Sequence, residues 1–254
     1  MILAVDVGNS NIVFGVSDGD HWLKVWRIRT DPLKTADEYE VIFHSLLSSS
    51  RLSHAKISKV VFSSVVPSLN REFITMVPRL LEAELIIVSP DIYDQLPLKI
   101  LNPYEIGTDL VANALAAYTR FGEMCMVIDF GTALTFTTIS DEGTILGVAI
   151  APGMQTAVRA LAGHTAQLPH VQLTYPPSVL GSNTIHAIQA GVVIGFGGLA
   201  DRIIEKTREE LGRKFITVAT GGLAGVLAGH TEKIGFVEEN LTLDGLRIIG
   251  SLVR

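Results

Sequence analysis

The sequence contains a single cysteine, Cys125, so it can form no disulfide within the chain and cannot build a zinc site from several thiolates. A lone thiol inside an apolar segment is typical of a reducing compartment, where it packs as a small hydrophobic side chain. Basic residues are also scarce, since 20 Lys and Arg stand against 26 Asp and Glu, for a formal net charge of −6. Nucleic-acid and anionic-membrane surfaces need clustered positive charge, so we expect neither kind of partner.

A targeting segment and a membrane span are not expected either. The chain begins Met-Ile-Leu-Ala-Val-Asp, without the basic residues that open a signal peptide. The most apolar long stretch, residues 185–200, is shorter than the ~20 apolar residues that a spanning helix needs. With 48% hydrophobic and 18% charged residues, the composition predicts a soluble, cytoplasmic, globular protein that acts on small molecules.

One short motif occurs twice in the sequence. An apolar run ends in Asp6-Val7-Gly8-Asn9, and about half a chain later another ends in Asp129-Phe130-Gly131-Thr132. A second apolar run follows each copy and leads to an acidic turn, at Asp18 and at Asp141, equally far beyond the first acid. Each copy is typical of a β-hairpin, and the repetition predicts two halves of one architecture.

Apolar runs and helical patterns alternate around these hairpins, which predicts an α/β protein with helices on the faces of largely parallel sheets. We expect two duplicated halves, residues 1–118 and 119–254, in contact along a cleft. The expected strands are 60–66, 85–88, 144–150 and 215–219, and the expected helices are 38–52, 71–82, 108–118 (with Thr108 as its N-cap), 154–161, 184–195 and 199–211.

The repeated turns suit phosphate binding. Gly8 and Gly131 carry no Cβ, so the backbone can approach an anion closely, and successive N–H groups can donate to its oxygens. Asp6 and Asp129 would repel a phosphate, so we expect each to hold a cation or the water around one, as Mg²⁺ sites commonly do. Two copies in the same hairpin frame favour nucleotide binding over an ordinary strand–turn boundary.

The two hairpins resemble the phosphate-binding hairpins of the actin-like ATPase superfamily, and Thr220-Gly221-Gly222 resembles its adenosine motif. That resemblance implies two ribonuclease-H-like domains with ATP in an interdomain cleft. Nearly the whole chain also resembles type III pantothenate kinases. The matching segments are Asp6-Val7-Gly8-Asn9-Ser10, Ser64-Val65-Val66-Pro67, Asn102-Pro103, Gly107-Thr108-Asp109, Asp129-Phe130-Gly131-Thr132-Ala133, Ala151-Pro152-Gly153, Thr165-Ala166-Gln167-Leu168-Pro169, Gly181 with Thr184, Gly191, and Thr220-Gly221-Gly222.

The resemblance implies a reaction and a set of site residues. The reaction is transfer of the ATP γ-phosphoryl group to the hydroxyl of pantothenate, the first step of coenzyme A synthesis, with Mg²⁺, a monovalent cation (K⁺ or NH₄⁺) and a homodimer. Asp109 is the implied catalytic base and Asp129 the implied monovalent-cation ligand. Asp6 is a candidate Mg²⁺ ligand, either directly or through a bound water. The implied ATP-binding residues are Asp6, Val7, Gly8, Asn9, Ser10, Asn11, Ile12, Val13, Gly131, Thr132, Gly221 and Gly222. The implied pantothenate-binding residues are Ile100, Gly107, Thr108, Asp109, Leu110 and Thr184.

Four positions depart from the family pattern. Leu110 stands where the family usually has an Arg that can reach the pantothenate carboxylate, and Ile100 where it often has Tyr. Leu134 stands where the family usually has Thr, and Val148 where it usually has the second Gly of a Gly-Gly pair. A lost charge-assisted hydrogen bond costs roughly 1.5–3 kcal/mol, and our hypothesis is that Arg159 or Lys99 replaces it. Two alternatives therefore stay open: a kinase for a different hydroxyl-bearing acceptor, and a weakly active paralogue with a binding or regulatory function.

Overall fold

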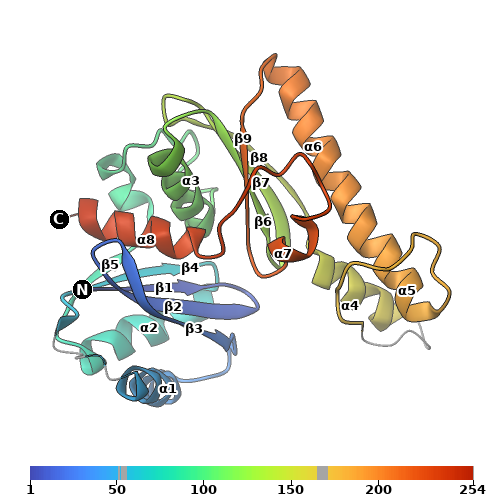
Figure 1. The fold of residues 1–254 in the computed structure, drawn as a ribbon. Helices are drawn as coiled ribbons and strands as arrows, with labels where there is room; N and C mark the ends of the chain where they lie inside the picture. The colour runs from blue at the N-terminus through green and yellow to red at the C-terminus, as the bar shows by residue number, and fades with distance from the viewer. Residues whose placement is uncertain (51, 53–55, 165–170, 254) are drawn as a thin grey trace. The chain divides into compact units, whose positions relative to one another are not determined.

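The computed structural model of the chain describes residues 1–50, 52, 56–164 and 171–253 (Figure 1). Met1–Ala116 and the segment from Leu241 onward form one compact unit, and Ala117–Asn240 form a second. The expected division into 1–118 and 119–254 is therefore wrong for the end of the chain. The final helix, α8 (Leu241–Leu252), packs on β1 and β4 of the first unit, because its apolar face completes the cover of that sheet.

The first unit contains one five-stranded mixed sheet in the order β3-β2-β1-β4-β5. The β1–β2 and β2–β3 pairs are antiparallel, whereas β1–β4 and β4–β5 are parallel. Its elements besides α8 are β1 (Ile2–Val7), β2 (Asn11–Asp18), β3 (His21–Arg29), α1 (Ala36–Ser49), β4 (Lys59–Ser64), α2 (Pro67–Leu80), β5 (Glu84–Ile87), the 3-10 helix η2 (Pro90–Gln95) and α3 (Thr108–Phe121), which runs into the second unit.

The second unit repeats this sheet, with the order β8-β7-β6-β9-β10 and the same pattern of antiparallel and parallel pairs. The predicted duplication is therefore confirmed, with β6 and β7 in the places of β1 and β2. The elements are β6 (Cys125–Phe130), β7 (Ala133–Ile139), β8 (Ile145–Pro152), α4 (Met154–His164), α5 (Thr184–Gln189), the π-helical stretch η3 (Ala190–Ile194), α6 (Gly195–Leu211), β9 (Ile216–Thr220), α7 (Ala224–Leu227) and β10 (Phe236–Val237).

One expectation about these sheets is wrong, and one strand was not expected. The sheets are mixed rather than largely parallel, because three consecutive strands in each unit form two antiparallel pairs beside the two parallel ones. Strand β3 was not expected, because it is a largely exposed edge strand that carries Lys24, Arg27 and Arg29 among its apolar residues. Trp22 and Trp26 lie on it and pack: the Trp22 indole donates to Asp244 Oδ1 of α8 at 2.8 Å, and Trp26 stacks on Phe14.

Aromatic rings dominate the core between the first sheet and helices α1 and α2. The Phe43 ring of α1 stacks on Phe14 of β2, with centroids 4.0 Å apart, and Phe73 of α2 meets both Phe43 and Phe62 of β4. Helix α8 covers the opposite face of the same sheet (Figure 1). The sheet is therefore enclosed on both sides, which fixes where the ends of β1 and β4 lie.

The helical run Thr184–Leu211 is continuous through α5, η3 and α6 rather than divided near residue 195. By length and composition alone it is the one described helix that could cross a membrane, whereas residues 185–200 were expected to be too short. The run gains its length from α6, whose second half carries the ion pairs Arg202–Glu205 and Lys206–Glu209. A single such helix is weak evidence of a membrane span.

We predict that Gly245→Ala destabilises the first unit, although alanine favours a helix. An added Cβ at Gly245 would lie 1.9 Å from the carbonyl oxygen of Ala112, where α8 meets α3. Overpacking against a backbone typically costs about 1–3 kcal/mol, so the Tm should fall. The matched control is Gly198→Ala in α6, where a Cβ meets nothing within 4 Å and should stabilise by up to about 1 kcal/mol. Equal effects of the two substitutions in thermal unfolding would contradict this packing.

Candidate functional site

The first predicted phosphate turn closes the β1–β2 hairpin. Gly8 N donates to the carbonyl of Asn11 at 3.0 Å, and a Cβ on Gly8 would lie 3.1 Å from that oxygen. Val7 and Ile12 are fully buried, so only their backbone can meet a ligand, whereas Asn9 is exposed at the tip. The turn thus presents backbone and small polar groups, as close approach to a phosphate requires.

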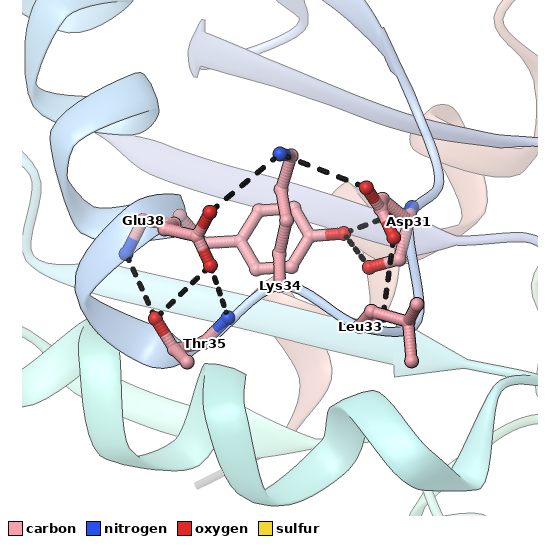
Figure 2. Close-up of polar contacts among 6 residues, drawn as sticks. Asp31, Leu33, Lys34, Thr35 and Glu38 are labelled. Atoms are coloured by element: carbon pink, nitrogen blue, oxygen red, sulfur yellow. Dashed lines mark hydrogen bonds and ion pairs between the residues drawn. The ribbon is translucent and has the colours of Figure 1, made fainter.

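Thr30 hydrogen-bonds to the backbone of this turn. Its hydroxyl donates to the Gly8 carbonyl at 2.6 Å, and its N–H donates to the Ser10 carbonyl at 3.1 Å. Thr30 is in turn fixed through Asp31, whose backbone N–H and C=O both bond the Tyr39 hydroxyl. Figure 2 shows this corner, with Lys34 paired to Asp31 and Glu38 beside the capping box at the start of α1.

Asp109 lies in the first turn of α3, whose first intrahelical bond runs from Val111 N to the Gly107 carbonyl at 3.2 Å. Gly107 therefore precedes the helix, and the expectation that Thr108 is the N-cap is wrong. The Thr108 hydroxyl instead lies 2.9 Å from Ser63 Oγ, because the end of β4 offers it a buried polar partner. Ser63 Oγ also donates to Asp6 Oδ1 at 3.4 Å. The start of α3 and the end of β1 are thus joined through two hydroxyls.

Burial raises the pKa of the Asp109 carboxyl, and hydrogen bonds from the backbone N–H groups of Leu110 and of Asp109 itself partly oppose that rise. The Leu110 N–H donates to Asp109 Oδ1 at 2.8 Å. A general base works best when its pKa approaches the working pH, so the raised pKa improves Asp109 for that role. Perturbed carboxyls of this kind occur preferentially at functional sites.

The remaining acceptor-site candidates fall into two sets. Ile100 and Leu110 lie in the first unit with Asp109, and the Leu110 side chain is buried in the core. Thr184 opens α5 in the second unit, where it lines a shallow groove of about 640 Å³ with Leu161, Ile188 and Val192 among others. Lys99 and Arg159 are both exposed, one in each unit. The motif Thr165-Ala166-Gln167-Leu168-Pro169 lies outside the described residues.

In the second unit, Asp129 is the next-to-last residue of β6 and lies beside Thr220 of the parallel strand β9. Gly221 follows with φ +90°, and a Cβ there would lie 2.4 Å from Asp129 Oδ1 and 2.8 Å from the Phe130 carbonyl carbon. Only glycine fits this conformation without strain. The second hairpin and the double-glycine motif, about 90 residues apart, are therefore in direct contact.

The Pro-Gly turn after β8 supports the second phosphate turn, in which Gly131 N donates to the Ala133 carbonyl at 3.1 Å. The Thr132 carbonyl accepts from Gly153 N at 3.0 Å and from the Thr156 hydroxyl at 2.7 Å. A Cβ at Gly153 would lie 2.2 Å from the Gly131 carbonyl oxygen. Three segments that the sequence separates thus form one turn region around Asp129.

The oxygen donors of these regions fit hard cations. Among the described residues there is no group of three or more His, Cys, Asp or Glu that could hold a metal by itself. Asp6 and Asp129 each provide a single carboxylate beside hydroxyl or carbonyl oxygens. Mg²⁺ usually keeps several waters and binds through one or two carboxylates together with substrate phosphates, so such sparse ligation suits it.

Three contributing residues were not expected from the sequence: Ser63, Thr30 and Tyr93. Ser63 directly precedes the matched segment Ser64-Val65-Val66-Pro67, so its place at the end of a strand was a usable signal. Thr30 carries no such signal, because its bonds to the first turn arise only when β3 pairs with β2. Tyr93 is buried in η2, and no local sequence pattern predicts this burial.

A sequence model of the type III pantothenate kinase family matches residues 2–206. A protein of Moorella thermoacetica named type III pantothenate kinase is 43% identical over 250 residues, which cover 98% of each chain. Among solved structures, a Baf family transcriptional activator of Campylobacter jejuni aligns with a TM-score of 0.61 and 19% identity over 97% of this chain and 96% of that one. A polyphosphate/ATP-glucomannokinase of an Arthrobacter species aligns with a TM-score of 0.52 and 14% identity, over 100% and 99% of the two chains. At these identities the two structures show the fold alone.

We predict that Asp109→Asn raises the Tm, and by more at neutral than at acidic pH. Folding raises the pKa of this carboxyl, so the folded state binds its proton more tightly than the unfolded state does. Stability is therefore lost as the pH rises from the ordinary pKa of an aspartate through the raised pKa, and Asn removes that loss. Thermal unfolding of both proteins at pH 5 and pH 8 measures the difference. A Tm gain that is equal at both values would rule out titration of Asp109 as its cause.

Proposed function

The chain belongs to the type III pantothenate kinase family, and we propose that Asp109 is the base in its ATP-dependent phosphorylation of pantothenate. This reaction opens coenzyme A biosynthesis. The observation that carries the proposal is a half-buried carboxyl at the start of α3, where the neighbouring Thr108 connects through Ser63 to Asp6 of the first glycine turn. A residue with a purely structural role would gain nothing from a desolvated carboxylate at this point.

In the proposed mechanism, Asp109 accepts a hydrogen bond from the pantothenate hydroxyl and orients its oxygen toward the γ-phosphorus of ATP. The new bond forms from that oxygen to phosphorus while the bond from phosphorus to the bridging oxygen of ADP breaks. The hydroxyl proton passes to Asp109 late, because the transition state of phosphoryl transfer is loose. A carboxyl with a raised pKa takes up that proton more readily than an ordinary one.

We assign the phosphates of ATP to the two glycine turns, residues 6–13 and 131–132, and its adenosine to Gly221 and Gly222. The support is the crowding around Gly131, Gly153 and Gly221, which keeps side chains out and the backbone rigid. Asp6 is placed to hold Mg²⁺, directly or through water, and Asp129 a monovalent cation. Bound there, the cations would neutralise charge that develops on the transferred phosphoryl group.

On the acceptor side we propose that Gly107, Thr108, Asp109 and Thr184 bind pantothenate, with Ile100 nearby. Leu110 is buried, so its side chain packs in the core and offers nothing to a carboxylate. The exposed cations Lys99 and Arg159 are candidates to replace the missing charge. A different hydroxyl-bearing acceptor is the alternative that this apolar position favours.

We also propose a cytoplasmic homodimer. Support for a covered surface comes from the second unit, where Ile150, Val179 and Leu180 are 69%, 69% and 86% exposed. Large apolar side chains on a surface often mark a protein interface. A regulatory role like that named for the Campylobacter protein is disfavoured by the retained Asp109, which a binding function does not need.

We predict that the purified protein forms phosphopantothenate from pantothenate, ATP, Mg²⁺ and K⁺, and that Asp109→Asn lowers kcat by about 10²- to 10⁴-fold. Mass spectrometry follows product formation, and titration with ATP measures nucleotide binding separately. The control is Asp141→Asn, which alters an exposed acid in the turn after β7 and should leave kcat unchanged. ATP binding without any product in the wild type would point to another acceptor or to a regulatory paralogue.

We predict that Asp129→Asn removes the activation by K⁺ or NH₄⁺, while a large part of the Mg²⁺ dependence remains. The reason is that Asn keeps the shape of the Asp129 side chain but removes the negative charge that would attract the cation. Initial rates at increasing K⁺, with ionic strength held constant by a bulky cation, give the activation constant. An unchanged K⁺ response would place the monovalent cation elsewhere.

A further inference from the structure

Tyr93 has a buried hydroxyl without a partner. The residue lies in η2, only 4% of it is exposed, and its hydroxyl oxygen makes no hydrogen bond to any described residue. Buried polar groups are nearly always hydrogen-bonded, and leaving one unpaired is unfavourable. Tyr93 therefore has a hydrogen bond to donate that no described residue accepts.

The position of Tyr93 indicates which partner is in reach. Helix η2 follows β5, and β1, β4 and β5 are parallel, so their carboxyl ends lie at one edge of the sheet. The start of α3 meets the same edge, because Thr108 bonds Ser63 and the carbonyl of Ser64 at the end of β4. Burial raises the pKa of Tyr93 to about 12, and the negative charge of Asp109 adds to that rise. The phenol therefore keeps its proton and remains a donor near a carboxylate.

The Asp109 carboxylate receives hydrogen bonds from backbone groups only, among the described residues. Its hydrogen bonds come from backbone N–H groups of Leu110 and of Asp109 itself, and no side chain among the described residues donates to it. Burial is the main cause of its raised pKa, and no charged side chain is among the causes. The nearest acid in the network, Asp6, is reached only through Thr108 and Ser63. Among the described residues, Asp109 therefore has backbone donors but no side-chain donor.

We propose that Tyr93 is a positioning residue for Asp109: its phenol donates to the carboxylate when Asp109 turns toward the acceptor hydroxyl. The bond would hold the carboxylate in the orientation that the substrate needs and favour its ionised form. Tyr93 would touch neither ATP nor pantothenate. This inference rests on the proposed role of Asp109 as the base.

The test is the pH dependence of kcat/KM for pantothenate in Tyr93→Phe at saturating ATP. Loss of a donor to the carboxylate should move the acidic limb upward by about one pH unit. The rate should then fall about tenfold below that limb and approach the wild-type rate well above it. The KM for ATP should stay unchanged, and the Tm without substrates should not fall, because Phe removes an unpaired buried hydroxyl.

The matched control is Tyr104→Phe, which changes an 84% exposed phenol in the segment before α3 and should move neither the limb nor the rate. Two results would overturn the proposal: an unmoved acidic limb in Tyr93→Phe, or a raised KM for pantothenate without a shift of the limb. The second would mean that Tyr93 contacts the acceptor directly. If the wild type forms no phosphopantothenate, the proposed function fails instead. The pKa of Asp109, read from its ¹³C carboxyl resonance in wild type and Tyr93→Phe with pantothenate present, then still decides the role of Tyr93.

Discussion

The parallel pairing of the first strand with the fourth is the constraint on which each unit depends. In the first unit it sets Asp6 beside Ser63, and in the second it sets Asp129 beside Thr220. Parallel strands end at the same edge of a sheet, so an acid and a hydroxyl become neighbours although they are far apart in sequence. In the first unit this edge positions the first glycine turn and the start of α3, and in the second unit the equivalent edge positions the second glycine turn and the double-glycine segment.

Close backbone approach is the second common feature of the two units, and each unit achieves it differently. In the second unit, Gly153 packs directly against the turn and Gly221 against Asp129, in positions where a Cβ would collide with them. In the first unit the Thr30 hydroxyl donates to the backbone of the turn. The next residue, Asp31, is hydrogen-bonded through its backbone to the Tyr39 hydroxyl. Rigid turns of this kind can present N–H groups to phosphates with little reorganisation.

The acceptor corner contains groups that do not favour the stability of the fold. Burial raises the pKa of the Asp109 carboxyl, and the buried Tyr93 hydroxyl has no hydrogen-bond partner among the described residues. Such unfavourable arrangements are typical of active sites, where function is retained at some expense of stability. Leu110 differs from both, because it packs in the core, so the departure from the family pattern at this position has a structural use.

The sequence by itself determined the duplicated architecture, the two glycine turns and the position of Asp109 in the first turn of a helix. These follow from local patterns: an apolar run that ends in an acid and a glycine turn, and a carboxylate in the first turn of a helix. It did not determine the mixed pairing of the sheets, the edge strand β3 or the return of α8 to the first unit, because each depends on which surfaces remain uncovered after the chain folds. Only the tertiary structure brought Ser63, Thr30 and Tyr93 to the site. Their hydrogen bonds, burial and charges come from residues distant in the sequence, and no local pattern records such neighbours.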